Sequence, residues 1–151
     1  MSFFNTDFKD FLMALNQHGV EYIVVGGYAV ILRGYSRSTG DLDIWINKTN
    51  SNFILLQKAL QKFGLPLEAV PEEQFFSEDF DVFSFGIPPN AIELMTAVKG
   101  VEFTVAYDAA TMEKVDDISI KVIHLKNLLQ AKKAANRSKD INDIENLPIA
   151  E

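Results

Sequence analysis

The chain has 151 residues, of which 48% are hydrophobic, contains no cysteine and carries a formal net charge of −7. This length suits one domain over residues 1–151 with a substantial core, whereas the acidic balance disfavours broad attachment to nucleic acid or anionic membranes. The lack of cysteine excludes disulfides and thiolate metal sites, and the absence of a long apolar stretch or a secretory-signal pattern predicts a cytoplasmic protein without membrane association.

The first third of the chain alternates between helical and strand patterns. Apolar residues recur at helical spacing over residues 7–17, and residues 21–26 then predict a buried strand that stops at a glycine pair. Residues 28–34 are short and apolar, as expected of a helix packed on a sheet. Residues 41–47 alternate between apolar and polar positions, which predicts a strand with two aspartates on one face.

The middle of the chain predicts a helix and a hairpin. Residues 50–64 form the helix, with Asn50 or Ser51 expected as its N-terminal cap and Gly64 as its stop. Residues 65–79 are irregular, with a short helix expected after Pro71. Residues 80–86 and 91–97 predict two strands that pair as a hairpin around the turn Ile-Pro-Pro-Asn.

The C-terminal third contains the least clear segment. Residues 101–115 fit neither a helix nor a strand decisively, whereas residues 118–123 predict a short strand. Helices are expected over residues 124–135 and from Asp140, as a cap, through Leu147. The mixture of elements predicts an α+β domain, or an α/β one, with helices packed on a small sheet.

The segment that joins the first two predicted strands carries the clearest chemical signal. Gly26 and Gly27 let the backbone turn sharply and let a phosphate approach without an intervening Cβ atom. Free N–H groups at the start of the following helix favour an anion at the same place. Asp41 and Asp43 project from one strand face about 6–7 Å apart, which suits Mg²⁺ bound together with substrate phosphates.

A third carboxylate lies in the apolar strand predicted over residues 91–97. Glu93 is costly at such a position unless it is paired or metal-bound, and the alternative is a solvent-facing side of the strand. Together with Asp41 and Asp43 it completes the donor set expected of a two-metal phosphoryl-transfer centre.

The order of these residues resembles that of a known family, the minimal nucleotidyltransferase superfamily with its polymerase-β-like fold. The positions that carry the likeness are Gly26-Gly27, Arg37-x-Thr39-x-Asp41-x-Asp43 and Glu93. Within the superfamily, the chain looks like small bacterial stand-alone domains near the type IV abortive-infection and lincosamide nucleotidyltransferases. Residues 124–147 also look like that group's closing helices, so a small mixed sheet with C-terminal helices is implied.

The resemblance implies an Mg²⁺-dependent transferase that moves a nucleoside monophosphate from an NTP, such as ATP, to a hydroxyl acceptor. Gly26 and Gly27 would line the triphosphate, Asp41 and Asp43 would bind two Mg²⁺ ions, and Glu93 would complete the site and help activate the hydroxyl. The chain departs from the pattern at Gly27, where many members have Ser, and at Glu93, where Asp is more frequent. These departures leave a second hypothesis open, a catalytically degenerate module that binds a nucleotide or a partner.

Several further residues are candidates with an ordinary alternative. Arg37 and Thr39 would contact phosphate or lie in a solvated loop, and Lys126 and Lys139 would bind nucleotide or lie on a solvated helix face. Trp45 would stack on a base, although core packing is the favoured role. Asp140 and Asp143 are expected to cap the last helix and to pair with nearby Lys or Arg, and Arg33 is expected in a surface position or a salt bridge.

The expected partners follow from the same hypotheses. They are an NTP and an acceptor that the sequence does not identify, whether a small molecule, an RNA or a protein. A second copy of the chain, or the other component of a toxin–antitoxin pair, is a further expected partner, and membranes are not.

Overall fold

The computed structural model describes residues 2–149, over which the chain forms seven α-helices, one 3-10 helix and six strands. The helices are α1 (Thr6–Gln17), α2 (Gly26–Leu32), α3 (Asn50–Phe63), η1 (Leu67–Ala69), α4 (Glu72–Phe76), α5 (Phe103–Ala109), α6 (Leu125–Ala135) and α7 (Ser138–Asn146). The strands are β1 (Tyr22–Val25), β2 (Leu42–Ile46), β3 (Val82–Phe85), β4 (Ile92–Met95), β5 (Thr111–Val115) and β6 (Ile118–Val122).

All six strands form one mixed sheet in the order β3-β4-β2-β1-β6-β5. The central pairs β2–β4 and β1–β6 are parallel, β1–β2 is antiparallel, and the outer pairs β3–β4 and β5–β6 are antiparallel hairpins. The hairpin predicted between residues 80 and 97 is confirmed. So is the α+β class with a small mixed sheet.

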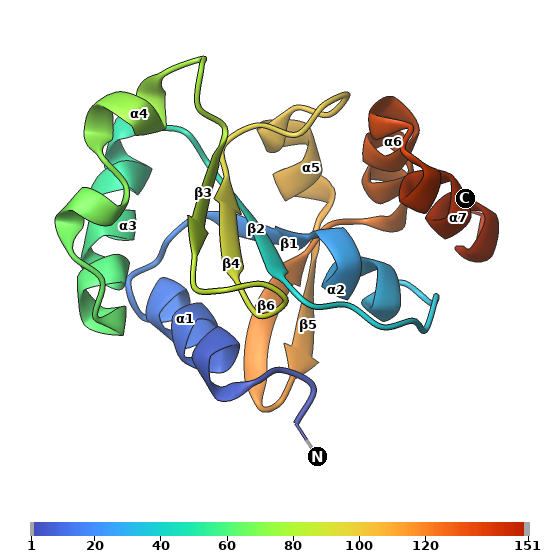
Figure 1. The fold of residues 1–151 in the computed structure, drawn as a ribbon, viewed down its shortest axis with the longest axis horizontal. Coiled ribbons are helices and arrows are strands. Elements are labelled where there is room, and N and C mark those ends of the chain that lie inside the picture. The colour runs from blue at the N-terminus through green and yellow to red at the C-terminus, as the bar shows by residue number, and fades with distance from the viewer. Residues whose placement is uncertain (1, 150–151) are drawn as a thin grey trace.

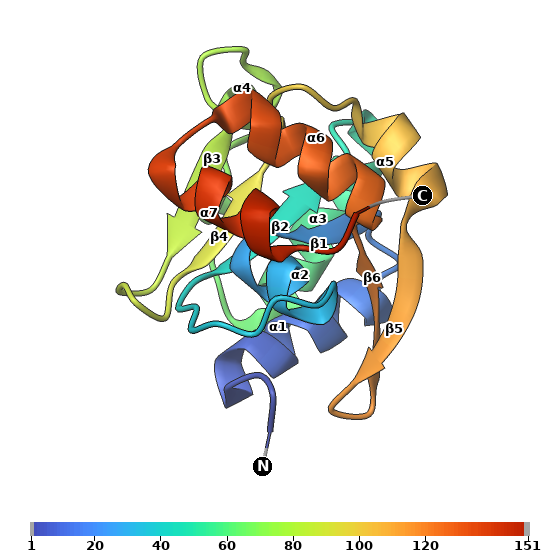
Figure 2. The ribbon, with the colours of Figure 1, turned by 90° about the vertical axis from the view of Figure 1, so that its right-hand side faces the viewer.

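The helices cover the sheet on two sides. In Figure 1, α1 and α3 lie on one side of the strands, and α6 and α7 lie on the other. Figure 2, viewed from the second side, shows α6 and α7 lying across the front of the strands, above α2. Helix α1 buries Phe8, Phe11 and Leu12 completely, which follows from their helical spacing. Strand β2 supplies Ile44 to the same core.

The structure corrects several details of the predicted elements. Helix α2 spans Gly26–Leu32 instead of residues 28–34, so the glycine pair belongs to it. The cap of α3 is Thr49 instead of Asn50 or Ser51, because the Thr49 hydroxyl accepts a hydrogen bond from the N–H of Asn52 at 3.2 Å. Helix α7 begins at Ser138, so Asp140 is its third residue and accepts from the N–H of Arg137 at 3.1 Å instead of forming the N-cap. The undecided residues 101–115 form α5 and then β5.

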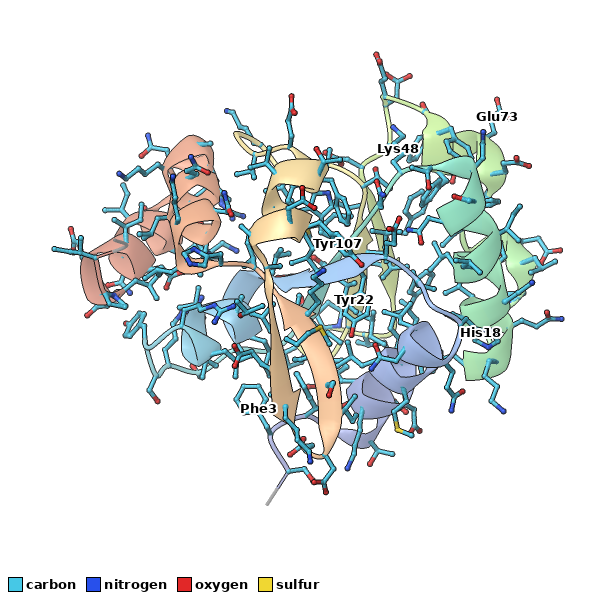
Figure 3. All side chains as sticks on the ribbon, turned by 180° about the vertical axis from the view of Figure 1, so that it is seen from behind. Phe3, His18, Tyr22, Lys48, Glu73 and Tyr107 are labelled. Atoms are coloured by element: carbon cyan, nitrogen blue, oxygen red, sulfur yellow. The ribbon has the colours of Figure 1, made fainter. Side chains whose placement is uncertain are left out.

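The rear view labels Phe3 and Tyr22, which hold the N-terminal segment and β1 in place (Figure 3). Phe3 lies beside the turn between β5 and β6, where its N–H donates to Asp116 at 2.9 Å. Tyr22 donates its hydroxyl proton to Asn16 at 2.8 Å, and burial raises the pKa of this hydroxyl. Between residues 2 and 149, no helix has the length and apolar character needed to cross a bilayer.

Asn52 links α3 to β1, which leads into the glycine pair, and to β2, which contains Asp43. Its side chain is only 1% exposed. Its Oδ1 accepts from the N–H of Glu21 at 2.8 Å, and its Nδ2 donates to the carbonyls of Glu21 at 3.0 Å and Asn47 at 2.8 Å. The start of β1 and the end of β2 are therefore held by one amide.

We expect Asn52→Ala to lower the free energy of unfolding by about 2–3 kcal/mol, because three backbone groups lose their partner. Asn50→Ala is the matched control, since Asn50 is exposed at the start of the same helix. Urea denaturation followed by circular dichroism measures both variants. Equal stability of the two would contradict the role given to Asn52.

Candidate functional site

The three predicted carboxylates lie on one face of the sheet. Asp43 is directly opposite Glu93 in the parallel β2–β4 pair and directly opposite Val25 in the antiparallel β1–β2 pair. Opposite residues in a sheet project to the same side, so the Asp43 and Glu93 side chains are neighbours. Asp41 precedes Asp43 by two positions, and its Oδ1 accepts a hydrogen bond from the N–H of Ala91 at 3.0 Å.

The environment of Asp43 perturbs its carboxyl group. Burial raises the pKa of Asp43 to about 7, and the charge of Glu93, a hydrogen bond with Glu93 and the charge of Asp41 act in the same direction. The ammonium of Lys139 opposes this shift. A nearby cation would therefore favour the ionised form of Asp43.

The glycine pair is required by what packs against it. Gly26 has φ +68°, and a Cβ atom there would overlap Oδ2 of Asp43 and lie 2.8 Å from its Cβ. At Gly27, a Cβ atom would overlap the Thr39 hydroxyl and lie 3.5 Å from Nη1 of Arg37. The absence of two side chains thus brings Asp43, Thr39 and Arg37 close to the backbone at the end of β1.

A cavity of about 370 Å³ joins these groups. Eight of the nine predicted site residues line it: Gly26, Gly27, Arg37, Thr39, Asp41, Asp43, Glu93 and Lys139. The ninth, Lys126, instead lines a separate cavity with Lys133, Ile144 and Leu147. The structure therefore assembles the predicted strand and loop residues in one place and puts Lys126 elsewhere.

Three residues of α6 and α7 that were not predicted as site residues also line the cavity: Lys132, Asn142 and Asp143. Lys132 is only 7% exposed, and its ammonium lies 3.2 Å from Asp140 and 3.0 Å from Asp143. The expected pairing of these aspartates with Lys or Arg is confirmed. The sequence signal was the pair of acids three residues apart after a basic run, although nothing in that run indicated that Lys132 is buried.

The same aspartates position two arginines. Arg37 donates from Nε to one carboxylate oxygen of Asp143 at 2.8 Å and from Nη2 to the other at 3.0 Å. Burial alone would raise the pKa of Asp143, but hydrogen bonds from Arg37 and Lys132 outweigh it and lower the pKa. Arg137 donates from Nε to Asp140 at 2.7 Å. The cationic side of the cavity is thus held in place by buried carboxylates.

Two other predictions concern residues outside the cavity wall. Trp45 is 1% exposed, and its ring contacts Phe103 edge to face at 5.3 Å between centroids, so its favoured role in the core is confirmed. Arg33 forms the expected salt bridge, to Glu113 at 3.3 Å.

The carboxylates offer oxygen donors of the kind that Mg²⁺ prefers. Among residues 2–149, however, no three acidic or histidine side chains converge closely enough to form a ready-made metal cluster. Asp43 and Glu93 are already adjacent, whereas Asp41 has one oxygen engaged by Ala91. The donor chemistry fits a divalent cation on the Asp43–Glu93 pair, and Asp41 would join it through its second oxygen.

No protein-family model matches the sequence, and no curated protein does either. Solved structures do match. A candidate nucleotidyltransferase from Thermotoga maritima is 16% identical, with 95% of this chain and 94% of that chain covered and a TM-score of 0.62. The lincosamide antibiotic adenylyltransferase LnuA, bound to lincomycin, is 13% identical, with 97% of each chain covered and a TM-score of 0.54. An antigenic nucleotidyltransferase-like protein from Paracoccidioides brasiliensis is 17% identical, with 93% and 73% covered and a TM-score of 0.53.

The close approach of Gly27 and Thr39 predicts energetic coupling between them. We expect Gly27→Ala alone to destabilise the fold by about 1–3 kcal/mol through overpacking. In the Thr39→Gly background the same change should cost less, because the overlapping hydroxyl and methyl groups are gone. A double-mutant cycle in urea should give a coupling of about 1 kcal/mol or more, and strict additivity would contradict the geometry.

The raised pKa of Asp43 predicts a pH dependence with a definite sign. Between the ordinary value of 3.8 and about 7, the folded chain binds more protons at Asp43 than the unfolded chain, so this group lowers stability as the pH rises through that window. Asp43→Asn should therefore gain about 1–3 kcal/mol on the wild type between pH 5 and pH 8. Asp79→Asn, at an exposed position outside the cavity wall, is the control. If the difference in the free energy of unfolding between Asp43→Asn and the wild type were the same at pH 5 and pH 8, the prediction would be contradicted.

Proposed function

We propose that this chain, which has the nucleotidyltransferase fold, transfers a nucleoside monophosphate from an NTP to an acceptor hydroxyl with the help of Mg²⁺. The observation that carries the proposal is the wall of one cavity. Three carboxylates, from Asp41, Asp43 and Glu93, share it with the side-chain-free backbone at Gly26 and Gly27. Acidic residues beside an open glycine turn suit metal-assisted chemistry on a phosphate.

Other residues that line the same cavity are suited to the triphosphate. The Thr39 hydroxyl has no hydrogen-bond partner among the described residues, and it lies where a Cβ atom of Gly27 would be. It therefore supplies a free donor beside the glycine turn, although Gly27 itself has no side chain to offer. Arg37 and Lys139 add positive charge on the same wall, which offsets phosphate charge.

In the proposed reaction one bond forms at phosphorus and one breaks. The acceptor oxygen forms a bond to the α-phosphorus as the bond from that phosphorus to the pyrophosphate oxygen breaks, and Glu93 accepts the hydroxyl proton. Mg²⁺ bound at Asp43, Glu93 and Asp41 would stabilise the charge that develops on the transferring and leaving groups. Lys139 and Arg37 hold the released pyrophosphate until it leaves.

For the acceptor, a small molecule is the class that we propose to test first. One structural neighbour is a lincosamide antibiotic adenylyltransferase in complex with lincomycin, so this fold accommodates such an acceptor in that protein. A net charge of −7 also argues against an extended nucleic-acid acceptor. Neutral or cationic polyhydroxylated compounds are therefore the first acceptors to screen.

A second candidate function is a binding module without turnover. Two observations favour it: both carboxylate oxygens of Asp143 engage Arg37, and the described residues contain no ready-made cluster of three metal ligands. Such a module would bind an NTP, and the nucleotide would stabilise it against heat, but it would release no pyrophosphate.

The decisive experiment measures pyrophosphate release with each NTP and Mg²⁺, with and without a panel of small polyhydroxylated acceptors. The wild type should turn over, and Asp43→Ala should lose activity on the order of 10²-fold or more. Asp10→Ala, an exposed acid outside the cavity, should behave like the wild type. NTP-dependent thermal stabilisation without turnover in any combination would favour the binding module and contradict the enzyme proposal.

A further inference from the structure

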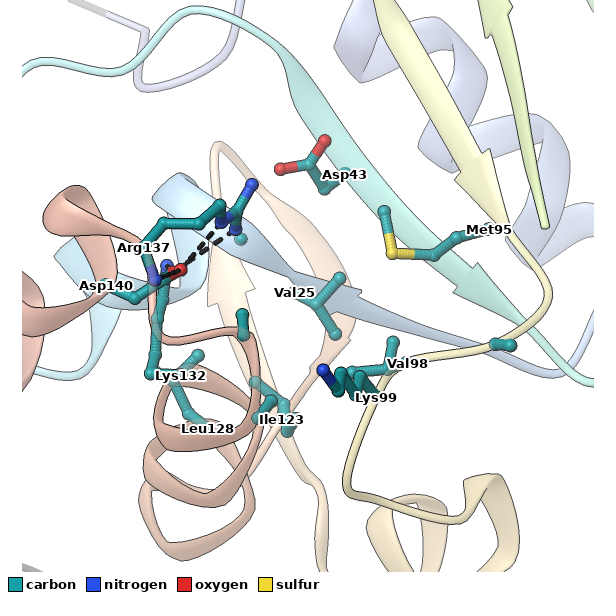
Figure 4. A pocket seen from close by; sticks show the side chains of 14 residues that line it. Val25, Asp43, Met95, Val98, Lys99, Ile123, Leu128, Lys132, Arg137 and Asp140 are labelled. Carbon is teal, nitrogen blue, oxygen red and sulfur yellow. Dashed lines mark hydrogen bonds and ion pairs between the residues drawn. The ribbon is translucent and has the colours of Figure 1, made fainter.

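A second cavity, of about 200 Å³, adjoins the polar one and has a different character (Figure 4). Its walls are mainly apolar and come from the ends of β1, β4 and β6, from the loop after β4 and from α6, with charged residues among them. The apolar residues that enclose it include Val25, Met95, Val98, Ile123 and Leu128. We call it the apolar slot.

The apolar slot is continuous with the polar cavity. Gly26, Asp43, Lys132 and Arg137 line both. Figure 4 shows Asp43 and Arg137 at one end of the slot and Lys99 at the other. A ligand with phosphates in the polar cavity would therefore have its non-phosphate portion beside the slot. Together the two spaces reach the about 300–1,000 Å³ that small-molecule sites usually occupy.

Some of the charged side chains that line the slot have hydrogen-bond partners, and one does not. Lys132 and Arg137 are both paired with Asp140, whose two oxygens accept four hydrogen bonds. Asp43 is at the border and is paired with Glu93. Lys99, in contrast, forms no ion pair or hydrogen bond among the described residues, and Figure 4 shows its nitrogen directed between Val98 and Ile123. It is therefore the ammonium of the slot that is available to a ligand.

The loop that carries Lys99 is pressed against α6. Gly100 has φ +86°, and a Cβ atom there would lie 2.5 Å from Cβ of Ala134. Val98 and Val101 form a β-bridge across the turn. This packing fixes the position of Lys99 relative to the slot, although its side chain remains exposed to solvent.

We infer that the apolar slot binds the base of the nucleotide and that Lys99 selects a base with a carbonyl on its outer edge. Aliphatic walls suit a flat ring, and an ammonium can only donate hydrogen bonds. Guanine O6 and uracil O4 accept them, whereas adenine and cytosine present an amino donor at the corresponding place. The acceptor is expected elsewhere, because Glu93 and Asp41 line only the polar cavity. The inference rests on the proposed function for the position of the phosphates.

Calorimetric titration in the presence of Mg²⁺ tests the phosphate site of the proposed function and the base site separately. The probes are GTP, UTP, ATP, CTP and inorganic tripolyphosphate. Tripolyphosphate reports on the polar cavity alone. We expect GTP and UTP to bind about tenfold more tightly than ATP and CTP, and all four to bind more tightly than tripolyphosphate. Lys99→Ala should abolish the difference between GTP and ATP without changing the affinity for tripolyphosphate.

Two variants complete the test. Ala131→Leu places a larger side chain in the slot and should weaken every NTP while sparing tripolyphosphate. Lys133→Ala removes a charge from the same helix outside both cavities and should leave all affinities unchanged. If ATP equals GTP, the selection by Lys99 is wrong. If NTPs bind no better than tripolyphosphate, the slot is not a base site, although the proposed function survives. If no probe binds, both fail.

Discussion

The register between β2 and β4 is the constraint on which the rest of the site depends. Parallel pairing puts Asp43 opposite Glu93, and antiparallel pairing puts Asp43 opposite Val25, the residue before the glycine turn. A slip of β2 by one residue would turn Asp43 toward the face that Leu42 and Ile44 bury in the core. Two adjacent carboxylates destabilise a sheet, so an arrangement that raises the pKa of Asp43 to about 7 points to function more than to stability.

The C-terminal helices supply the charge that balances this acidic strand end. Lys132 is buried between two aspartates, and each aspartate also binds an arginine that lines the polar cavity. Because a buried charge is tolerated only with partners, removal of either aspartate would release an arginine and leave Lys132 with an incomplete ion pair. Helices α6 and α7 are thus part of the site, although Asp143 is 106 residues from Arg37 along the chain.

The sequence predicted those parts of the molecule whose signal is local. Three features depend only on neighbouring residues: the glycine pair, the alternation over β2 and the hairpin of β3 and β4. The sequence predicted all three, and the structure contains them. Helix α5 was not predicted, because its seven residues are too few for helical spacing to stand out from strand spacing. Helix α2 has the same length, but the glycine pair marks its beginning. The burial of Lys132 was also not predictable, since it arises from contacts with the next helix and a basic run has the same appearance on a solvated face. Lys126 and Lys139 both belong to the basic C-terminal segment, yet they line different cavities, and the sequence of that segment does not show which lysine faces which cavity.

The binding place of the metal and the phosphates is the central point to test. A crystal structure of the chain soaked with Mg²⁺ and a non-hydrolysable NTP would test it. We predict a cation bound by Asp43 and Glu93, with the phosphates lying over Gly26 and Gly27 and within reach of the Thr39 hydroxyl. A nucleotide bound outside the polar cavity, or a cation that these two carboxylates do not contact, would contradict the account.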